Sequence, residues 1–147
     1  MATRSTIALE FADGTVQQVY CHWDGYLSNN GQILLRHYSD PFKLQRLIDL
    51  GAISSLGPEI GEKQDFDKRD THNDNWTLIY ARDRGEELVK HTYKDYADYK
   101  ANAQSEEYNY ILRTDGKWYV EFYGEFDGLL EQAIADEQDR EAQEEMA

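Results

Sequence analysis

Two stretches of the chain have the pattern of β-hairpins, and this pattern constrains the fold more than any other feature. In each stretch, two runs rich in β-branched and aromatic residues flank an Asp-Gly pair, which is typical of a tight turn. The turns are Ala12-Asp13-Gly14 and Thr114-Asp115-Gly116. The strands that we expect are Thr6–Phe11 with Thr15–Tyr20, and Glu107–Arg113 with Lys117–Tyr123.

The second hairpin also indicates which of its faces is buried. Large apolar side chains occupy every second position of both strands, and alternate positions of a strand point to the same face of a sheet. Paired across the turn, these side chains predict one continuous apolar face. They are Tyr108, Tyr110 and Leu112 in the first strand, and Trp118, Val120 and Phe122 in the second.

The segment between the hairpins contains helical signals. The clearest predicted helix has Asp40 as its N-cap, Pro41 at its first position and Gly51 just after its end. The segment Thr92–Ala103 begins like a capping box and predicts another helix, with Tyr93, Tyr96 and Ala97 as its buried stripe. We also expect a helix over Gln32–Tyr38, a polar exposed loop over residues 58–75 and a strand over Trp76–Ala81.

We predict that the last element is a helix that is apolar only in its first half. Its apolar stripe consists of Phe126, Leu129, Leu130, Ala133 and Ile134. Beyond Ala135 no apolar face remains, so the acidic end should project or fray. The order β-β-α-α-β-α-β-β-α favours an α+β domain. We expect a mainly antiparallel sheet of about five strands with helices packed on one face, plus an acidic C-terminal helix.

Charge is concentrated in this last segment. The 147-residue chain has a formal net charge of −14 at pH 7, and residues 125–147 hold nine acidic side chains and one basic side chain. The segment therefore carries −8 and the first 124 residues carry −6. We accordingly divide the chain into a single α+β domain, residues 1–124, and an acidic helical extension, residues 125–147.

A negative field of this kind limits what the protein can bind. It repels nucleic-acid backbones and anionic membranes and attracts basic protein surfaces, so we expect neither nucleic acid nor membrane as a direct partner. If residues 125–147 were fully helical, a carboxylate would occur about every 3.8 Å, against about every 1.7 Å in duplex DNA. Mimicry of nucleic acid would therefore be partial. The candidate partner-binding residues are Glu131, Asp136, Glu137, Asp139, Glu141, Glu144 and Glu145.

The composition also excludes several classes of protein. A single cysteine, Cys21, excludes an internal disulfide and a cysteine-rich metal site. No apolar run approaches the roughly 18 residues of a membrane-spanning helix. Met1–Leu9 lacks the basic-then-apolar order of a signal peptide. We therefore expect a soluble protein of a reducing cytoplasm.

The segment Cys21-His22-Trp23-Asp24-Gly25 has the highest density of reactive side chains. Cys21 and His22 are adjacent in an extended segment and should point to opposite faces, which argues against a thiol–imidazole pair. His22 and Asp24 should share a face, where they could form a base with its orienting carboxylate or part of a metal site. In the alternative that we favour, Cys21 and Trp23 fill the core, and the two polar side chains lie on the solvent face or cap the turn.

Arg82 and Arg84 are the best candidates for binding an anion. They lie at the end of a predicted strand, and two guanidinium groups can hold a carboxylate or a phosphate. In the alternative that we favour, they pair with nearby acidic residues such as Asp83 and Glu86. Together with His22 and Asp24 they would form a candidate ligand site if the fold brings all four into one pocket.

Residues 65–74 resemble a calcium-binding loop only at first sight. An EF-hand loop would need glycine at Asp70 and glutamate at Trp76, so a solvated loop is the better interpretation. His72 and Asp74 are weaker candidates for metal ligands. The chain has no phosphate-binding glycine loop and no nucleophile elbow. We expect no catalytic residue, no cofactor and no metal.

Two segments resemble the markers of a protein family. They are Tyr20-Cys21-His22-Trp23-Asp24-Gly25-Tyr26 and Ala81-Arg82-Asp83-Arg84-Gly85-Glu86. With His37-Tyr38 and the helix over Lys43–Leu50, they resemble a family of small uncharacterised proteins from tailed bacteriophages and bacterial genomes. The similarity covers most of residues 4–123 and excludes the acidic extension. It implies a phage-related origin, and hence the host cytoplasm, but no activity.

The sequence favours a non-enzymatic interaction protein over an enzyme. In a phage, such a protein would be a host-takeover or anti-defence factor that binds a basic surface of a host protein, for example of a nucleic-acid-binding protein. The alternative is a small enzyme or an anion- or ligand-binding domain that uses the four candidate site residues. A third hypothesis rests on the eleven tyrosines and predicts a structural protein that forms a homo-oligomer.

Overall fold

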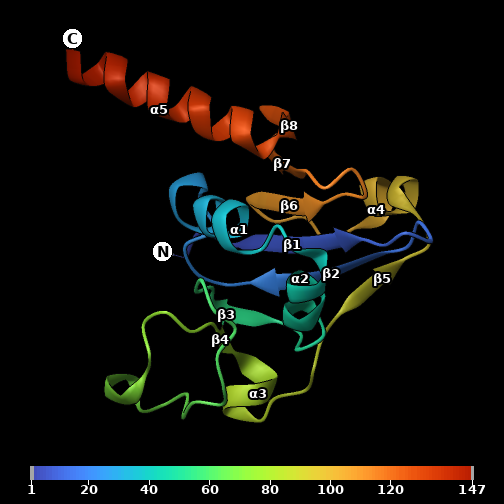
Figure 1. The fold of residues 1–147 in the computed structure, drawn as a ribbon, viewed down its shortest axis with the longest axis vertical. Coiled ribbons are helices and arrows are strands. Elements are labelled where there is room, and N and C mark those ends of the chain that lie inside the picture. The colour runs from blue at the N-terminus through green and yellow to red at the C-terminus, as the bar shows by residue number, and fades with distance from the viewer. Residues whose placement is uncertain (1, 147) are drawn as a thin grey trace.

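The structure is a computed structural model that describes residues 2–146 (Figure 1). Within these residues, eight strands form one sheet in the order β4-β3-β2-β1-β6-β7-β8, and β5 also pairs with β2. The strands are β1 Ser5–Glu10, β2 Val16–Cys21, β3 Ile53–Ser55, β4 Leu78–Ile79, β5 His91–Tyr93, β6 Tyr108–Leu112, β7 Trp118–Phe122 and β8 Phe126–Leu129.

Five α-helices in the described part of the chain accompany the sheet. They are α1 Gln32–His37, α2 Pro41–Ile48, α3 Tyr80–Arg84, α4 Tyr96–Asn102 and α5 Leu130–Met146. A π-helical turn, η1, covers Leu27–Gly31 and leads directly into α1, and a 3-10 turn, η2, covers Arg69–Thr71. Of the helices in residues 2–146, none is both long enough and apolar enough to cross a membrane.

The α+β fold class is confirmed, but the sheet is larger and more mixed than we predicted. Strand β1 pairs in parallel with β6, with Ile7 opposite Tyr110, and β2 pairs in parallel with β3. The two predicted hairpins are both present, as β1–β2 and β6–β7. Turn residues reveal a hairpin because its strands are adjacent in sequence. They contain no information on the parallel pairing that joins the two hairpins through β1 and β6.

The main hydrophobic core lies between the sheet and the helices α1, α2 and α5. The predicted face of the second hairpin is confirmed, because Tyr110 lies opposite Val120 and Leu112 lies opposite Trp118. The predicted start of α2 is also confirmed, since the Asp40 carboxylate accepts a hydrogen bond from the Phe42 N–H group at 2.9 Å. The helices contribute Leu34, Leu44, Leu47, Ile48, Leu130, Ala133 and Ile134 to this core.

Helices cover both faces of the sheet, whereas we predicted only one. Adjacent strand residues point to opposite faces, so Ala8 and Ile111 lie on the far side from Ile7 and Tyr110. There they pack with Tyr99 of α4 in a second, smaller core.

The prediction for α4 was wrong in its first residue and in its face. Asp95, not Thr92, is the N-cap, and its carboxylate accepts a hydrogen bond from the Asp98 N–H group at 2.7 Å. The preceding residues, His91–Tyr93, form β5. Because the helix starts later than predicted, Tyr99 is its buried residue and Ala97 is exposed.

Two further predictions of element type need correction. The strand predicted over Trp76–Ala81 shrinks to the two residues of β4, and the chain then turns into α3. Phe126–Leu129 is the strand β8 and not the first turn of the last helix, because it pairs with β7. Its apolar residues fit helical spacing as well, so pairing with a neighbouring strand decided the outcome. Residues 58–75 form the predicted loop, apart from η2.

Candidate functional site

The side chains of His22 and Asp24 extend from the loop after β2 but are not bonded to each other. The His22 Nδ1 atom lies 2.6 Å from the Tyr20 hydroxyl group, and its ring meets Trp23 edge-on at 4.7 Å. Asp24 has a left-handed backbone conformation, with φ 56°, and its carbonyl oxygen accepts a hydrogen bond from the Asn30 N–H group. Among the described residues, the imidazole is therefore oriented by a tyrosine and not by the Asp24 carboxylate.

Cys21 lies in the core, as we predicted, but the prediction that Trp23 also fills the core was wrong, because Trp23 is 41% exposed. Strand β2 ends at Cys21, so the alternation of faces on which that prediction rested does not continue to Trp23. Cys21 is fully buried, and burial raises the pKa of its thiol to about 11. A thiol with so high a pKa stays protonated near neutral pH and is a poor nucleophile.

Arg82 holds the polypeptide backbone in place. Its guanidinium group donates to the carbonyl oxygens of Ile60 and Gly61 at 2.9 and 3.2 Å and to that of Thr77 at 2.7 Å. It also pairs with the buried carboxylate of Asp83. That carboxylate in turn accepts hydrogen bonds from the N–H groups of Ile79 and Gln64. The guanidinium thus fastens the long loop to α3 and has little capacity left for a ligand.

Arg84 lies in a different environment although it belongs to the same helix. Its guanidinium carbon lies 4.3 Å from the centre of the Phe66 ring and 5.0 Å from that of Tyr80. It also forms an ion pair with Glu86. No hydrogen bond or ion pair within residues 2–146 connects Arg82 or Arg84 with His22 or Asp24. The convergence on which the ligand-site hypothesis depends is therefore not seen in the contacts of the described residues.

The weaker metal candidates likewise do not converge. In residues 2–146, no three His, Cys, Asp or Glu side chains are grouped closely enough to hold a metal ion. His72 instead bonds through Nε2 with the Asp65 carbonyl oxygen at 2.7 Å.

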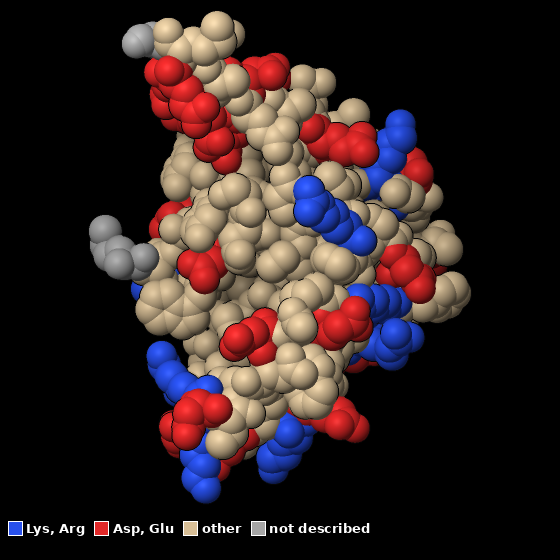
Figure 2. Space-filling view, turned by 60° about the vertical axis from the view of Figure 1, so that its left-hand side comes forward, with Lys and Arg blue, Asp and Glu red and all other residues tan. Residues whose placement is uncertain are grey.

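The helix α5 has a packed start and an exposed end. Leu130, Ala133 and Ile134 are buried, and the start of the helix packs on β7, β8 and η1. Every residue from 138 to 146 is exposed. The predicted projecting end is confirmed, and it is helical and not frayed. Figure 2 shows acidic side chains along this projecting end and a largely uncharged surface beneath it.

One acidic face of α5 continues the line of its buried residues. Side chains three, four and seven positions apart lie on the same side of a helix. Glu137, Glu141 and Glu144 therefore lie on the same side of the helix as Ala133 and Ile134, and of these three carboxylates only Glu137 is partly buried. The other candidate partner-binding residues lie at the edge of this face or on other sides of the helix, and they are Glu131, Asp136, Asp139 and Glu145.

An aromatic and acidic cluster lies beside this face of α5, and the sequence did not single it out. The rings of Tyr108 and Tyr123 are 5.5 Å apart, and the Tyr123 hydroxyl group donates to the Glu107 carboxylate at 3.2 Å. Tyr123 is 57% exposed and has a left-handed backbone, with φ 55°. Glu137 is close enough for its charge to contribute to the raised pKa of Tyr108, whose main cause is burial. The hairpin signal placed Tyr108 correctly but gave no indication of this neighbourhood.

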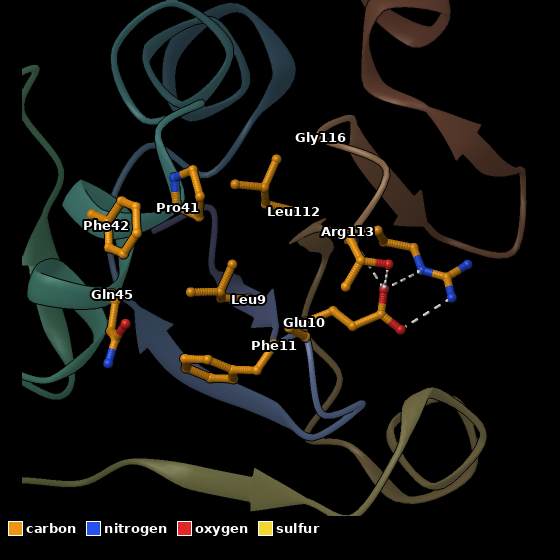
Figure 3. A pocket seen from close by; sticks show the side chains of 11 residues that line it. Leu9, Glu10, Phe11, Pro41, Phe42, Gln45, Leu112, Arg113 and Gly116 are labelled. Carbon is orange, nitrogen blue, oxygen red and sulfur yellow. Dashed lines mark hydrogen bonds and ion pairs between the residues drawn. The ribbon is translucent and has the colours of Figure 1, made fainter.

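An apolar groove lies at the carboxyl ends of β1 and β6 (Figure 3). It measures about 520 Å³ and is lined by Leu9, Phe11 and Leu112 together with Pro41 and Phe42 of α2. Such concave apolar surfaces are where small molecules most often bind.

One wall of this groove is polar, but its charges are paired. Arg113 donates to both carboxylate oxygens of Glu10, at 3.1 and 3.2 Å, and Thr114 donates through its N–H and hydroxyl groups. Partial burial would raise the pKa of Glu10, but these bonds outweigh it and hold the pKa below its usual value. The groove therefore presents an apolar surface with a neutral ion pair at its edge.

The two segments that resemble a phage and bacterial family have structural roles in this fold. Tyr20–Tyr26 ends β2 and forms the loop that leads to η1, and Ala81–Glu86 contains most of α3. The family assignment stays a prediction. Comparisons with models of protein families, with curated proteins and with solved structures found no match.

Proposed function

We propose that the protein is a non-enzymatic binding protein whose helix α5 engages a basic surface of another protein. The observation that carries this proposal is the exposed helical end of α5, which extends beyond the last buried residue, Ile134. In a phage, the protein would act in the host cytoplasm as a host-takeover or anti-defence factor.

The charge of α5 supports an electrostatic mode of binding. The helix carries seven carboxylates and one arginine, Arg140, over 17 residues. At 1.5 Å per residue this is about 25 Å, or one carboxylate per about 3.6 Å. Duplex DNA presents one charge per about 1.7 Å, so α5 resembles nucleic acid only partly. Such a field speeds encounters with basic proteins and weakens as salt is added.

The alternative, a ligand-binding or catalytic site at His22, Asp24, Arg82 and Arg84, has less support. Arg82 is bonded to three backbone carbonyl groups and to Asp83. The imidazole of His22 is paired with Tyr20. Both groups thus have structural partners, which leaves them fewer hydrogen-bonding atoms for a ligand.

The proposal can be tested by neutralising the end of α5. The variant D139N/E141Q/E144Q/E145Q changes four exposed carboxylates and shifts the net charge from −14 to −10. Wild-type protein immobilised on beads should capture basic proteins from a bacterial lysate at low salt and release them at high salt. The variant should capture much less of the same proteins, as judged by mass spectrometry.

A matched control separates the position of the charges from their number. The variant E62Q/D67N/D70N/D74N removes four exposed carboxylates from the long loop and reaches the same net charge. It should capture the same proteins as the wild type. If the α5 variant and the loop variant behave alike, the helix has no special role and the proposal is wrong.

A further inference from the structure

The chain already binds two of its own arginines in the same way. The Arg84 guanidinium lies against the rings of Phe66 and Tyr80 and pairs with Glu86. The arrangement unites a cation–π contact with a charge-assisted hydrogen bond.

The second example lies on the opposite face of the sheet from the main core. The Arg113 guanidinium carbon is 3.5 Å from the centre of the Tyr96 ring, and its nitrogen atoms donate to the Glu10 carboxylate. In both cases an aromatic face supports the flat side of the guanidinium while a carboxylate binds its edge.

A third set of the same groups lies beside α5, but none of the cations in the described residues is paired with it. Tyr108 and Tyr123 supply two rings at 5.5 Å, and Glu107 and Glu137 supply two carboxylates. Within residues 2–146, no lysine or arginine forms an ion pair with either carboxylate or a cation–π contact with either ring. Arg140, one turn further along α5, is exposed and forms no ion pair there either.

Glu137 is the member of this set that would gain most from a cation. It is half-buried, and burial together with the charge of Glu141 raises its pKa, although the charge of Arg140 partly opposes this. A partly desolvated carboxylate without a cation is unfavourable, and an arriving positive charge would relieve that cost.

We propose that this corner between α5 and the β7–β8 turn binds an arginine side chain of the partner, in preference to lysine. The inference rests on the proposed function, because it names the residue type that the acidic helix would recognise. Arginine fits better than lysine since its planar guanidinium can stack on Tyr123 and at the same time donate two hydrogen bonds to a carboxylate.

Two labelled peptides test the preference directly. One is a nine-residue peptide with four arginines separated by glycine and serine, and the other has lysine at the same four positions. Fluorescence anisotropy with the full-length protein at low salt should show the arginine peptide binding roughly threefold to tenfold more tightly. The Tyr123→Leu variant should bind both peptides with nearly equal affinity, because it lacks the exposed ring.

Two further variants make the result specific. Phe42→Leu removes another exposed ring, 74% accessible and located on α2, and should keep the preference for arginine. Glu137→Gln should weaken the binding of the arginine peptide by a factor similar to that for Tyr123→Leu. Circular dichroism would show whether each variant is folded. Tyr108→Phe, which keeps the ring and removes only the hydroxyl group, is a milder substitution in the same cluster.

The outcomes distinguish the two proposals. If the wild type binds both peptides equally tightly and the α5 charge variant binds neither, the helix is a basic-surface binder but the arginine corner is wrong. If the wild type binds neither peptide, the proposed function fails as well. A preference for arginine that survives in Tyr123→Leu would also contradict the inference.

Discussion

Arg82 and Arg84 lie two positions apart in α3, and their surroundings are nevertheless opposite. The Arg82 side chain is 13% exposed and faces a carboxylate that is fully buried, whereas the Arg84 side chain is 43% exposed and lies on two rings. The sequence suggested pairing with nearby acidic residues for both arginines, and both do pair in this way. It could not distinguish a buried anchor from a surface contact, because burial depends on where the 58–75 loop passes.

This difference predicts unequal costs for the same substitution. Arg82→Met would leave the Asp83 carboxylate buried without its cation, and the free energy of unfolding should fall by about 3–5 kcal/mol. Arg84→Met removes an exposed ion pair and should cost less than about 1 kcal/mol. Urea denaturation followed by tryptophan fluorescence would measure both. Equal costs would contradict the assignment of Arg82 as a structural residue.

At the scale of elements, the predictable parts were those with a local chemical signal. The Asp-Gly turns revealed both hairpins, and Asp40 with Pro41 revealed the start of α2. The strands β3, β4, β5 and β8 contain only two to four residues each, too few for a periodic pattern. Their pairing depends on neighbours that are distant in sequence, so the sequence predicted too few strands and missed the parallel pairing of β1 with β6.

The junction of β1 with the β6–β7 turn predicts a dependence of stability on pH. Glu10 has a lowered pKa in the folded protein, so its bonds with Arg113 and Thr114 stabilise the fold fully above the unfolded value of about 4.3. This contribution is lost as the pH falls through the lower folded pKa. Wild-type protein should therefore be more stable than Glu10→Gln at pH 7, and the difference should shrink below about pH 4.

Urea denaturation at pH 7 and at pH 3 would measure this difference. Glu62→Gln is a suitable control, because Glu62 is exposed and forms no hydrogen bond or ion pair in the described residues. It should leave the stability at both pH values nearly unchanged. A difference between wild type and Glu10→Gln that is the same at pH 3 and pH 7 would show that the carboxylate charge is not responsible.

For the whole molecule, the division of the chain by packing lies later than the division by charge at residue 124, because β8 pairs with β7 and the start of α5, as far as Ile134, belongs to the main core. The lack of buried residues at the acidic end of α5 follows from the absence of an apolar stripe after Ile134, so the sequence predicted it. The cluster of Tyr108, Tyr123 and Glu107 could not be predicted. Glu107 directly precedes Tyr108, the first residue of β6, and Tyr123 directly follows β7, so the β6–β7 pairing brings them together, but no local pattern places this end of the hairpin beside α5.

This division predicts that the end of α5 contributes nothing to the stability of the domain. A chain that ends at Glu137 loses residues 138–147, of which 138–146 are all exposed, and three negative charges, net, so its melting temperature should stay within about 2 °C of the wild type. Ile134→Ala, one turn earlier, should cost about 2–5 kcal/mol because it leaves a cavity against the sheet. Thermal unfolding followed by circular dichroism compares the two.

At low salt the shortened chain should be equally or slightly more stable, since part of the self-repulsion is removed. A large loss of stability would mean that the end of α5 packs on the domain, and α5 would then be a structural element and not an exposed binding surface.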